Sequence, residues 1–390
     1  MTRIVVTGLG VISAIGNNVA ENRSALMQAK CGISKNNHFD SRYASLLPFG
    51  EIKISNEAFR TRFSITDAGV TRTSLLALQA FIEAVENSGL SIGDIAASDT
   101  AFINASTVGG MCLTDELYKD ATGNNADSPF LTSYDSAATA MFIQNRYGMC
   151  GLINTINTAC SSSANAIMYG AGLIKNGMAK RAIVGGVDSL AKFTINGFNA
   201  LHILSPDICT PFDAGRTGLN LGEGAAFLIL ENLEDCAGKK IYGELTGYCN
   251  TNDSYHPSSL SENGDGPYLA MKGALDIARM SADKIDFINA HGTGTENNDE
   301  VESKAMLRIF EKPPLFASTK SNTGHTLGAA GAVEAVYSLL SMEHQEIYPS
   351  LNFKMPIEST GLSPVLEYKK MPVRHIMSNS FGFGGNCSSL

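Results

Sequence analysis

The leading candidate for a reactive residue in this chain is a cysteine. Cys160 lies in the segment NTACSSSANAI, between a short stretch rich in Ile, Thr and Asn and a run with apolar residues at helical spacing. It is therefore expected on an elbow between a strand and a helix. Unpaired amides and the helix dipole favour an anion there, so we predict a lowered thiol pKa and a nucleophilic thiolate. The ordinary alternative is a small buried apolar group, which most cysteines are.

Two histidines follow far downstream, each in a glycine-rich segment. His291 ends a strand-like run and opens HGTGT, where Gly292 and Gly294 let the backbone approach a ligand closely. His325 lies in KSNTGHTLGAAG at the opening of an apolar helix, where the dipole disfavours protonation and favours a neutral imidazole. A lone histidine at a strand end is usually a structural group. The glycine-rich segments around the two histidines strengthen the case for Cys160 as a reactive residue.

A lysine, a glutamate and the final loop complete the candidate set. Glu334 sits in an apolar helix, where an unpaired carboxylate is costly to bury, and Lys320 is the nearest cationic partner in sequence. The alternative is that Glu334 reaches water at an edge. The segment SNSFGFGGNCSSL is either a packed strand with a tight turn or an active-site loop. In the second case its N–H groups face an oxyanion, and Phe381 and Phe383 form an apolar wall.

An α/β framework must position these residues. Strand-like runs alternate with helical ones along nearly the whole chain, which predicts mostly parallel sheets covered by helices. The helices that follow Cys160 and His325 are apolar on nearly every face and must be buried. This pattern predicts a central helical layer between two sheets, in two similar halves. Residues 1–240 would hold the cysteine, and residues 241–390 would hold the histidines and the lysine.

Composition excludes several classes of protein. The 390 residues are 44% hydrophobic and 17% charged, which is enough for a large core. A net charge of -9 without a polybasic run argues against nucleic-acid binding. Eight cysteines without a C-x-x-C pair argue against a disulfide scaffold or structural zinc, and favour a reducing cytoplasm. No apolar run is long enough to cross a bilayer.

The N-terminal segment MTRIVVTGLGVISAIG is expected to form a strand, IVVTG, followed by a glycine-rich turn. Gly8, Gly10 and Gly16 interrupt the apolar stretch that would otherwise suggest a signal peptide. A dinucleotide-binding turn is the other alternative for these glycines. It is disfavoured because Ser13 replaces the third glycine, and no acidic residue for a ribose follows at the required spacing.

Six segments, taken in order, resemble the beta-ketoacyl-acyl-carrier-protein synthases, the elongating condensing enzymes of fatty acid and polyketide synthesis. They are VVTGLGVIS, TACSSS, PFDAGRTGLNLGEGAA, HGTGT, KSNTGHTLGAAGAVE and NSFGFGG, and they span the length of the chain. The resemblance implies a thiolase-like five-layer α-β-α-β-α sandwich made of two similar halves. It also implies a homodimer and an acyl carrier protein as partner. The expected substrates are malonyl and acyl thioesters on phosphopantetheine, with no further cofactor.

The resemblance implies roles for the reactive residues. Cys160 would accept an acyl group from a carrier-bound thioester. His291 and His325 would stabilise the enolate that forms as malonyl thioester loses carbon dioxide. The resulting carbanion would attack acyl-Cys160, which elongates a fatty acyl, polyketide or polyene chain. Lys320 with Glu334 would fix the hydrogen-bonding state of His325.

The resemblance also implies binding roles for the residues around them. The backbone N–H groups of Cys160 and Phe383 would form the oxyanion hole. Phe383 would gate the acyl tunnel, and Phe381 would be part of its apolar wall. The remaining expected positions are Thr293 and Thr295 for the pantetheine arm, Val108 as a limit to tunnel depth, and Asn289, Glu334, Ser378 and Asn379 as ligands of a structural cation that some members hold.

The chain departs from the family pattern at two places, one in the final loop and one near the expected docking site of the carrier. Asn386 and Cys387 replace a common Thr-Asn pair after GFGG. Pro206 and Asp207 stand where members often place a basic residue near the carrier. Docking of the carrier is therefore expected to rely on other basic residues, namely Arg60, Arg62 or Arg72.

Two alternative functions stay open at this point. A thiolase uses two cysteines and a histidine, and Cys387 would be its second cysteine, although a thiolase would not need His291 and His325 together with Lys320. The other alternative is a non-catalytic subunit that shapes the tunnel of a partner. Such subunits usually lack the nucleophile, whereas Cys160 is present.

Overall fold

Two β-sheets form the framework of the chain in a computed structural model that describes residues 2–35, 41–123 and 128–390. The first sheet is drawn from residues 4–244, in the strand order β3 (Ile153–Ile156), β2 (Thr100–Ala105), β4 (Arg181–Asp188), β5 (Gly224–Asn232), β1 (Ile4–Ser13) and β6 (Gly243–Glu244). The second is drawn from residues 249–389, in the order β7 (Cys249–Asn252), β13 (Asn386–Ser389), β12 (Ile376–Phe381), β8 (Phe287–Asn289) and β9 (Leu315–Ala317). A separate pair joins β10 (Glu346–Ile347) and β11 (Lys369–Lys370).

The sheets are mixed, so the prediction of mostly parallel sheets is only partly right. Strand β2 runs parallel to β3 and β4, and β8 runs parallel to β9 and β12. The pairs β4–β5, β1–β5 and β12–β13 are antiparallel. Parallel neighbours need a long crossover connection, whereas β12 returns into β13 through the short GFGG turn.

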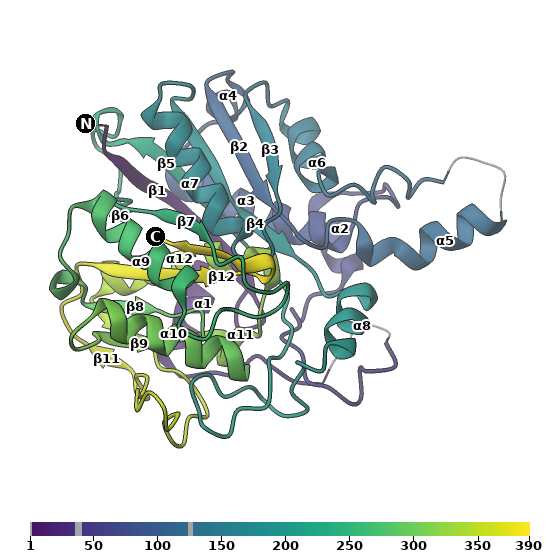
Figure 1. Cartoon of the computed structure of the whole chain (residues 1–390). Helices are drawn as coiled ribbons and strands as arrows, with labels where there is room; N and C mark the ends of the chain where they lie inside the picture. Colours follow the sequence, from purple (N-terminus) through teal and green to yellow (C-terminus); the bar gives the residue numbers. More distant parts are fainter. Residues whose placement is uncertain (1, 36–40, 124–127) are drawn as a thin grey trace.

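Helices pack in three layers around the two sheets, and the predicted five-layer sandwich is confirmed (Figure 1). On the outer side of the first sheet, α3 (Arg72–Ser88) packs on β1 and β5. Between the sheets, α7 (Ser162–Lys175) contacts β2 and β4, and α12 (Ala330–His344) contacts both β5 and β12. Beyond the second sheet lie α9 (Asp265–Ala278) and α10 (Glu296–Ile309). The other helices are α1 (Val19–Met27), α2 (Asn56–Phe63), α4 (Ile92–Ala96), α5 (Thr114–Gly123), α6 (Ala138–Tyr147), α8 (Lys192–Ala200) and α11 (Lys320–Thr323).

The two central helices are buried, as their sequences predict. Every residue of α12 from Ala330 to Ser341 is buried. The two helices approach closely because small residues meet: a Cβ atom added at Gly331 would lie 2.8 Å from the backbone nitrogen of Ala164. The hydroxyl of Ser163 accepts a hydrogen bond of 2.8 Å from the N–H of Ala332. The loops before both helices are thereby held next to each other.

The N-terminal strand continues through Gly8 and Gly10, where a turn was expected. Strand β1 covers Ile4–Ser13, and all ten residues are buried. A Cβ atom at Gly10 would lie 2.0 Å from the carbonyl oxygen of Ala80, and one at Gly8 would lie 2.5 Å from that of Ala84. These glycines therefore let α3 lie directly on the strand. The predicted turn is therefore wrong at Gly8 and Gly10, which serve close packing, and the chain turns only at Ser13–Gly16, whose backbone groups bond to each other.

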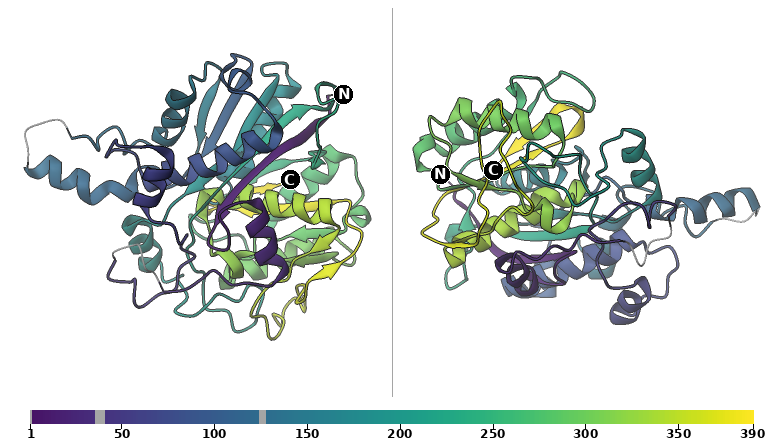
Figure 2. Two further views of the ribbon diagram at one scale, coloured as in Figure 1. Left: turned by 180° about the vertical axis from the view of Figure 1, so that it is seen from behind. Right: turned by 90° about the horizontal axis from the view of Figure 1, so that it is seen from below.

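One segment leaves the body of the molecule. Helix α5 projects away from the sheets when the chain is seen from the front and from behind (Figures 1 and 2). None of its residues is buried. Within the described part of the chain, no helix combines the length and the apolar character that crossing a membrane requires.

Candidate active site

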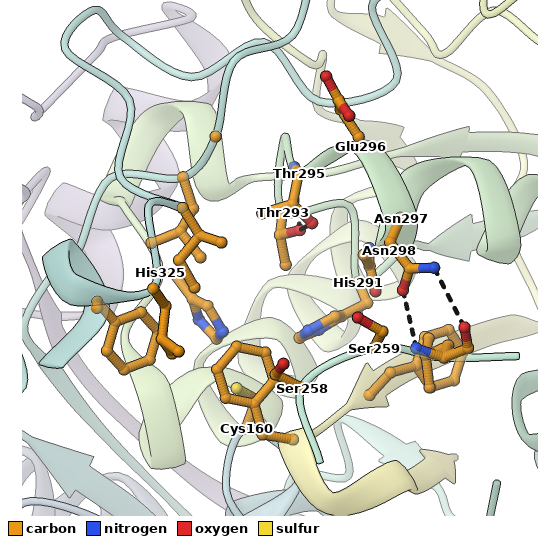
Figure 3. A pocket seen from close by; sticks show the side chains of 18 of the residues that line it. Cys160, Ser258, Ser259, His291, Thr293, Thr295, Glu296, Asn297, Asn298 and His325 are labelled. Carbon is orange, nitrogen blue, oxygen red and sulfur yellow. Dashed lines mark hydrogen bonds between the residues drawn. The ribbon is translucent and has the colours of Figure 1, made fainter. Parts of the chain in front are cut away.

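A cavity of about 420 Å³ opens where loops from both halves of the chain meet (Figure 3). Three segments that lie far apart in sequence bring Cys160, His291 and His325 into its lining. Four other predicted site residues line it as well, namely Thr293, Thr295, Phe381 and Phe383.

The reactive atoms of the cysteine and the two histidines converge. The sulfur of Cys160 and one ring nitrogen each of His291 and His325 all lie within 4.8 Å of one another. The two imidazole rings are 5.3 Å apart between centroids and nearly perpendicular, at 82°. Both rings point into the space beside the sulfur (Figure 3). A single bound group can therefore touch all three side chains at once.

The cysteine sits on a strained turn between β3 and α7. The preceding residue, Ala159, has a φ of 54°, which is uncommon for a residue other than glycine. Two of the following serines hold this turn. Ser161 donates a hydrogen bond of 2.7 Å from its hydroxyl to the carbonyl of Thr158, and Ser162 donates one of 2.5 Å to the carbonyl of Ala159. The serine cluster thus fixes the elbow predicted from the sequence.

Burial raises the pKa of the Cys160 thiol to about 11, so the predicted lowering of its pKa is wrong for the free protein. The loss of solvation outweighs the ammonium of Lys320 and the backbone N–H groups of Phe383 and Cys160, which act in the opposite direction. The resting cysteine is therefore a neutral thiol. Its proton must therefore leave the sulfur when the cysteine attacks a thioester. The N–H groups of Phe383 and Cys160 nevertheless lie close enough to the sulfur to act on its pKa.

A buried lysine organises the first histidine. The ammonium of Lys320 contacts Nδ1 of His291 at 3.3 Å and donates a hydrogen bond of 2.5 Å to the carbonyl of His291. It also forms a short ion pair with Glu334, which confirms the burial and pairing predicted for that carboxylate. The sequence-based expectation placed Lys320 beside His325. The ring it contacts is that of His291, because the turn at α11 directs the lysine toward the end of β8.

Hydrogen bonds fix one tautomer of each imidazole. An ammonium can only donate, so Nδ1 of His291 accepts and its Nε2 carries the proton. In the second ring, Nδ1 of His325 accepts a hydrogen bond of 3.3 Å from the N–H of Leu327. The Nε2 atom of His325 is buried and has no hydrogen-bond partner in the described part of the chain. Both rings therefore hold an Nε2–H donor, and that of His325 is free to bind a ligand.

Both histidines are neutral. Burial lowers the pKa of His291 and of His325 well below the ordinary value, and the positive charge of Lys320 adds to the effect. The prediction of a neutral His325 is right, but the reason differs from the one expected. Helix α12 begins only at Ala330, so His325 is not in its first turn. The cause is desolvation and a nearby cation rather than the helix dipole.

Two acidic residues that sequence reasoning missed hold the HGTGT loop. Glu302 accepts hydrogen bonds from the N–H groups of His291 and Gly292, at 2.9 and 2.8 Å. Asp299 accepts one of 2.9 Å from the N–H of Thr293. Both carboxylates are fully buried on α10. Their spacing of three residues on the helix that follows the loop is a signal that would have indicated them.

The apolar side of the cavity is built from aromatic rings. Phe383 stacks on Phe198, with centroids 5.7 Å apart and ring planes at 18°. Phe381 packs edge-on against His291. Phe198 also lines the cavity and was not predicted. Val108 was expected to limit the depth of the tunnel, but it is absent from the lining and is buried in an apolar cluster with neighbours that include Leu190, Leu219 and Leu327.

The residues predicted to hold a cation offer oxygen ligands close to this site. The Oε2 atom of Glu334 is buried without a hydrogen-bond partner in the described residues. Asn289 donates to the hydroxyl of Ser378 at 3.4 Å, and Asn379 donates to Glu302 rather than to Glu334. The unpartnered carboxylate oxygen fits a hard cation, which takes oxygen ligands.

The residues that depart from the family pattern have structural roles. The side-chain oxygen of Asn386 accepts hydrogen bonds from Ser161, Asn165 and Asn250, which ties the final loop to the start of α7. Cys387 is fully buried and does not line the cavity. The final segment therefore combines the two predicted possibilities, because it is a packed strand whose turn lines the cavity.

The three arginines expected to receive a carrier are differently engaged. Arg72 makes two hydrogen bonds of 2.9 and 2.6 Å to Glu223, and its side chain is only 12% exposed. Arg60 donates to the backbone carbonyls of Asp67 and Val70, and Arg62 donates a hydrogen bond of 2.9 Å to the side-chain oxygen of Gln79. The structure therefore removes Arg72 as a docking residue, because its charge is already paired.

Comparison with known proteins agrees with this site. The model of the beta-ketoacyl synthase N-terminal domain matches residues 1–236, and that of the C-terminal domain matches residues 242–354. The 3-oxoacyl-[acyl-carrier-protein] synthase 2 of Vibrio cholerae is 34% identical over 411 residues, which cover all of this chain and 98% of the relative. The enzyme of the same name from Coxiella burnetii is 34% identical over 409 residues, covering 97% of the relative.

Solved structures agree as well. The ishigamide ketosynthase/chain length factor matches with a TM-score of 0.93 and 30% identity, over all of this chain and 98% of the other. A type II PKS ketosynthase in complex with its acyl-carrier protein matches with a TM-score of 0.90 and 27% identity, again over all of this chain and 98% of the other. The chain belongs to the beta-ketoacyl synthase family.

Proposed function

We propose that this protein is a 3-oxoacyl-[acyl-carrier-protein] synthase that condenses an acyl thioester with malonyl thioester as carbon dioxide leaves. The observation that carries the proposal is the convergence of one thiol and two neutral imidazoles within 4.8 Å. Family membership supports it, since curated relatives bear this name at 34% identity over their full length. Cys160 would hold the growing chain, and the histidines would act on the malonyl unit.

The first half-reaction would transfer the acyl group to Cys160. The sulfur attacks the thioester carbon, a new carbon–sulfur bond forms, and the pantetheine thiolate leaves. The thiol proton passes to the departing pantetheine sulfur, because both imidazoles present an Nε2–H donor to the cavity and their Nδ1 atoms already accept hydrogen bonds. The backbone N–H groups of Cys160 and Phe383 would stabilise the negative oxygen of the tetrahedral intermediate. This proton transfer is needed because burial keeps the thiol protonated.

The second half-reaction would generate a carbanion by decarboxylation. The bond between the carboxylate and the α-carbon of malonyl thioester breaks, carbon dioxide leaves, and the electron pair forms an enolate. The Nε2–H groups of His291 and His325 would donate hydrogen bonds to the enolate oxygen. The α-carbon then attacks acyl-Cys160, and the cysteine sulfur leaves as a thiolate that regains a proton. Neutral donors suit this step because they stabilise developing charge without giving up a proton first.

The surrounding residues would bind and position the substrates. Thr293 and Thr295 share a hydrogen bond of 2.9 Å and would orient the pantetheine arm. Lys320, paired with Glu334, would hold His291 in its donor tautomer. Phe381 and Phe383 would enclose the acyl chain. Asn289, Glu334, Ser378 and Asn379 would hold a structural cation, which supplies positive charge to the buried carboxylate.

The partners we propose are an acyl carrier protein and a second copy of the chain. The carrier is supported by the related ketosynthase that was solved with its acyl-carrier protein. The homodimer is supported by β3, which lies at the edge of the first sheet. Exposed apolar side chains flank that edge, namely Met141 on α6, Leu152 just before β3, and Tyr169 on α7. We propose a cytoplasmic location and no cofactor beyond the phosphopantetheine of the carrier.

Two observations weigh against the alternatives. A thiolase would need a second cysteine at the site, whereas Cys387 is buried outside the cavity. A non-catalytic subunit would not need a thiol beside two donor imidazoles.

The test is to incubate purified protein with an acyl-carrier thioester and malonyl-carrier thioester, and to measure carbon dioxide and the 3-oxoacyl product by mass spectrometry. We expect equal amounts of both. Product formed from acetyl thioester alone would favour a thiolase, and neither product would favour a tunnel-shaping subunit.

A further inference from the structure

A buried aspartate with no assigned role lies at the end of β4. Asp188 is fully buried and gathers hydrogen bonds from two loops. Most of these hydrogen bonds come from the loop after β2. The hydroxyl groups of Ser106 and Thr107 donate at 2.8 and 2.6 Å, and the backbone N–H groups of Thr107 and Val108 donate at 2.9 and 2.8 Å. From the loop after His325, the backbone N–H of Gly328 donates a further hydrogen bond, of 2.7 Å, to the same carboxylate. One carboxylate therefore joins the first half of the chain to the second.

The bonding partners indicate that this carboxylate is ionised. The backbone N–H groups of Thr107, Val108 and Gly328 can only donate, so each needs an acceptor oxygen. A buried carboxylate that accepts several N–H bonds is stabilised in its charged form, although burial acts against it. No lysine or arginine bonds to it among the described residues. The bound loops therefore supply the stabilisation that a counter-ion would otherwise give.

The contact with Gly328 lies next to the hydrogen bond that orients the second histidine. Leu327, the preceding residue, donates its N–H to Nδ1 of His325. Leu327 has a φ of 51°, in the left-handed region that a leucine rarely adopts, so this turn must be held by its surroundings. A Cβ atom at Gly328 would lie 2.8 Å from Oδ2 of Asp188 and 3.2 Å from the backbone nitrogen of Thr107. Only glycine therefore allows so close an approach.

We propose that Asp188 is a positioning residue for His325. By holding the N–H of Gly328, it keeps the strained turn in the conformation that directs the Leu327 N–H at Nδ1 of His325. The proton of the ring then stays on Nε2, where it faces the cavity. This inference rests on the proposed function for its catalytic meaning, because a donor at Nε2 is what enolate stabilisation needs. The geometric part concerns the free protein and can be tested without turnover.

The first measurement is the tautomer of His325 by nitrogen-15 NMR of the imidazole, with His325→Gln used to assign its signals among the seven histidines of the chain. We expect one protonated nitrogen, Nε2, and one unprotonated nitrogen, Nδ1, in the unaltered protein. In Asp188→Ala the turn loses its acceptor, and both tautomers become populated, so the two signals move toward each other. Gly328→Ala tests the same contact from the other side and is expected to give the same change.

The matched control is Thr107→Val, which removes one hydroxyl from the same carboxylate but leaves the Gly328 contact in place. It is expected to keep the tautomer of His325 unchanged. If Asp188→Ala does not fold, Gly328→Ala decides the matter. If His325 keeps its single tautomer in a folded Asp188→Ala or Gly328→Ala variant, the proposal is overturned. It is also overturned if Thr107→Val mixes the two tautomers of His325 to the same extent as these variants do.

The second measurement separates positioning from general structural damage. Asp188→Ala is expected to lower malonyl decarboxylation by about tenfold to a hundredfold, because one enolate donor is partly lost. Acylation of Cys160, followed by mass spectrometry, is expected to persist. Equal loss of both steps contradicts the role assigned to Asp188. If the unaltered protein decarboxylates nothing, the proposed function fails, whereas the tautomer result still decides what Asp188 does.

Discussion

The ammonium of Lys320 lies 3.3 Å from Nδ1 of His291 and is ion-paired with Glu334, with all three side chains buried. One cation thus does two things. It neutralises a carboxylate inside the protein, and it sets the tautomer of a ring in the cavity. Stability reports the neutralised carboxylate and decarboxylation reports the tautomer, so mutations can separate the two effects.

Lys320→Met is expected to lower the free energy of unfolding by about 3–5 kcal/mol, because it leaves the carboxylate of Glu334 buried and unpaired. Chemical denaturation measures this change. The control is the double variant Lys320→Met, Glu334→Leu, which removes both charges and is expected to regain most of the stability. Decarboxylation should stay low in both, since His291 has lost its donor to Nδ1. Full stability of the single variant would contradict the buried ion pair.

The neutral thiol predicts how Cys160 reacts with iodoacetamide. Because its pKa is raised to about 11, the alkylation rate at Cys160 should keep rising roughly tenfold per pH unit well above the ordinary thiol range of about 8.5. In the urea-unfolded chain the same cysteine should level off near that ordinary value. Peptide mass spectrometry follows the labelled site. A rate that is already constant near neutral pH would instead indicate a thiolate at rest.

His325→Ala is expected to separate the two half-reactions. Loss of one preorganised donor should lower decarboxylation about a hundredfold or more, whereas transfer of an acyl group to Cys160 should continue. Carbon dioxide release and the mass of the acylated protein measure the two steps. His375→Ala is a suitable control, because His375 is 41% exposed and lies outside the cavity. Parallel loss of both steps would show that His325 also serves acylation.

Two glycines offer a matched test of the packing beneath the site. Gly10→Ala would place a Cβ atom 2.0 Å from the carbonyl of Ala80. We expect it to destabilise the protein by about 1–3 kcal/mol or more, as overpacking does. Gly172→Ala on α7 meets no atom within 4 Å and should stabilise the helix by up to about 1 kcal/mol. Thermal unfolding distinguishes them, and equal effects would contradict the close contact of α3 with β1.

Much of the framework was predictable because its signals are local. Helix α3 ends at Ser88 with Gly89 as its cap, and α7 ends at Lys175 with Asn176 as its cap, and both cap residues are types that end helices. The apolar faces of α7 and α12 predicted their burial. Each of these features depends on a short stretch of sequence. The convergence of Cys160, His291 and His325 was instead implied by the resemblance to the beta-ketoacyl synthases, which rests on six segments that span the chain.

The wrong or missing predictions concern contacts between segments that lie far apart in the sequence. The shift of the Cys160 pKa was predicted in the wrong direction. The strand-to-helix turn can be predicted from the neighbouring residues, whereas the burial that raises the pKa depends on the whole fold. Lys320 was assigned to His325, which is close to it in sequence, although the fold brings it to His291. Asp188 was missed because an acidic residue at the end of a strand gives no local sign of the distant N–H groups that will donate hydrogen bonds to it.

The most direct test of the central claim follows one acyl group through the cysteine. The protein is first loaded with an isotope-labelled acyl-carrier thioester, freed of excess donor, and then mixed with malonyl-carrier thioester in a single turnover. We predict that the label is found first on the peptide that contains Cys160. It then moves into a 3-oxoacyl product as carbon dioxide appears, and Cys160→Ala does neither. A label that stays on Cys160, or that reaches the product in Cys160→Ala, would contradict the account.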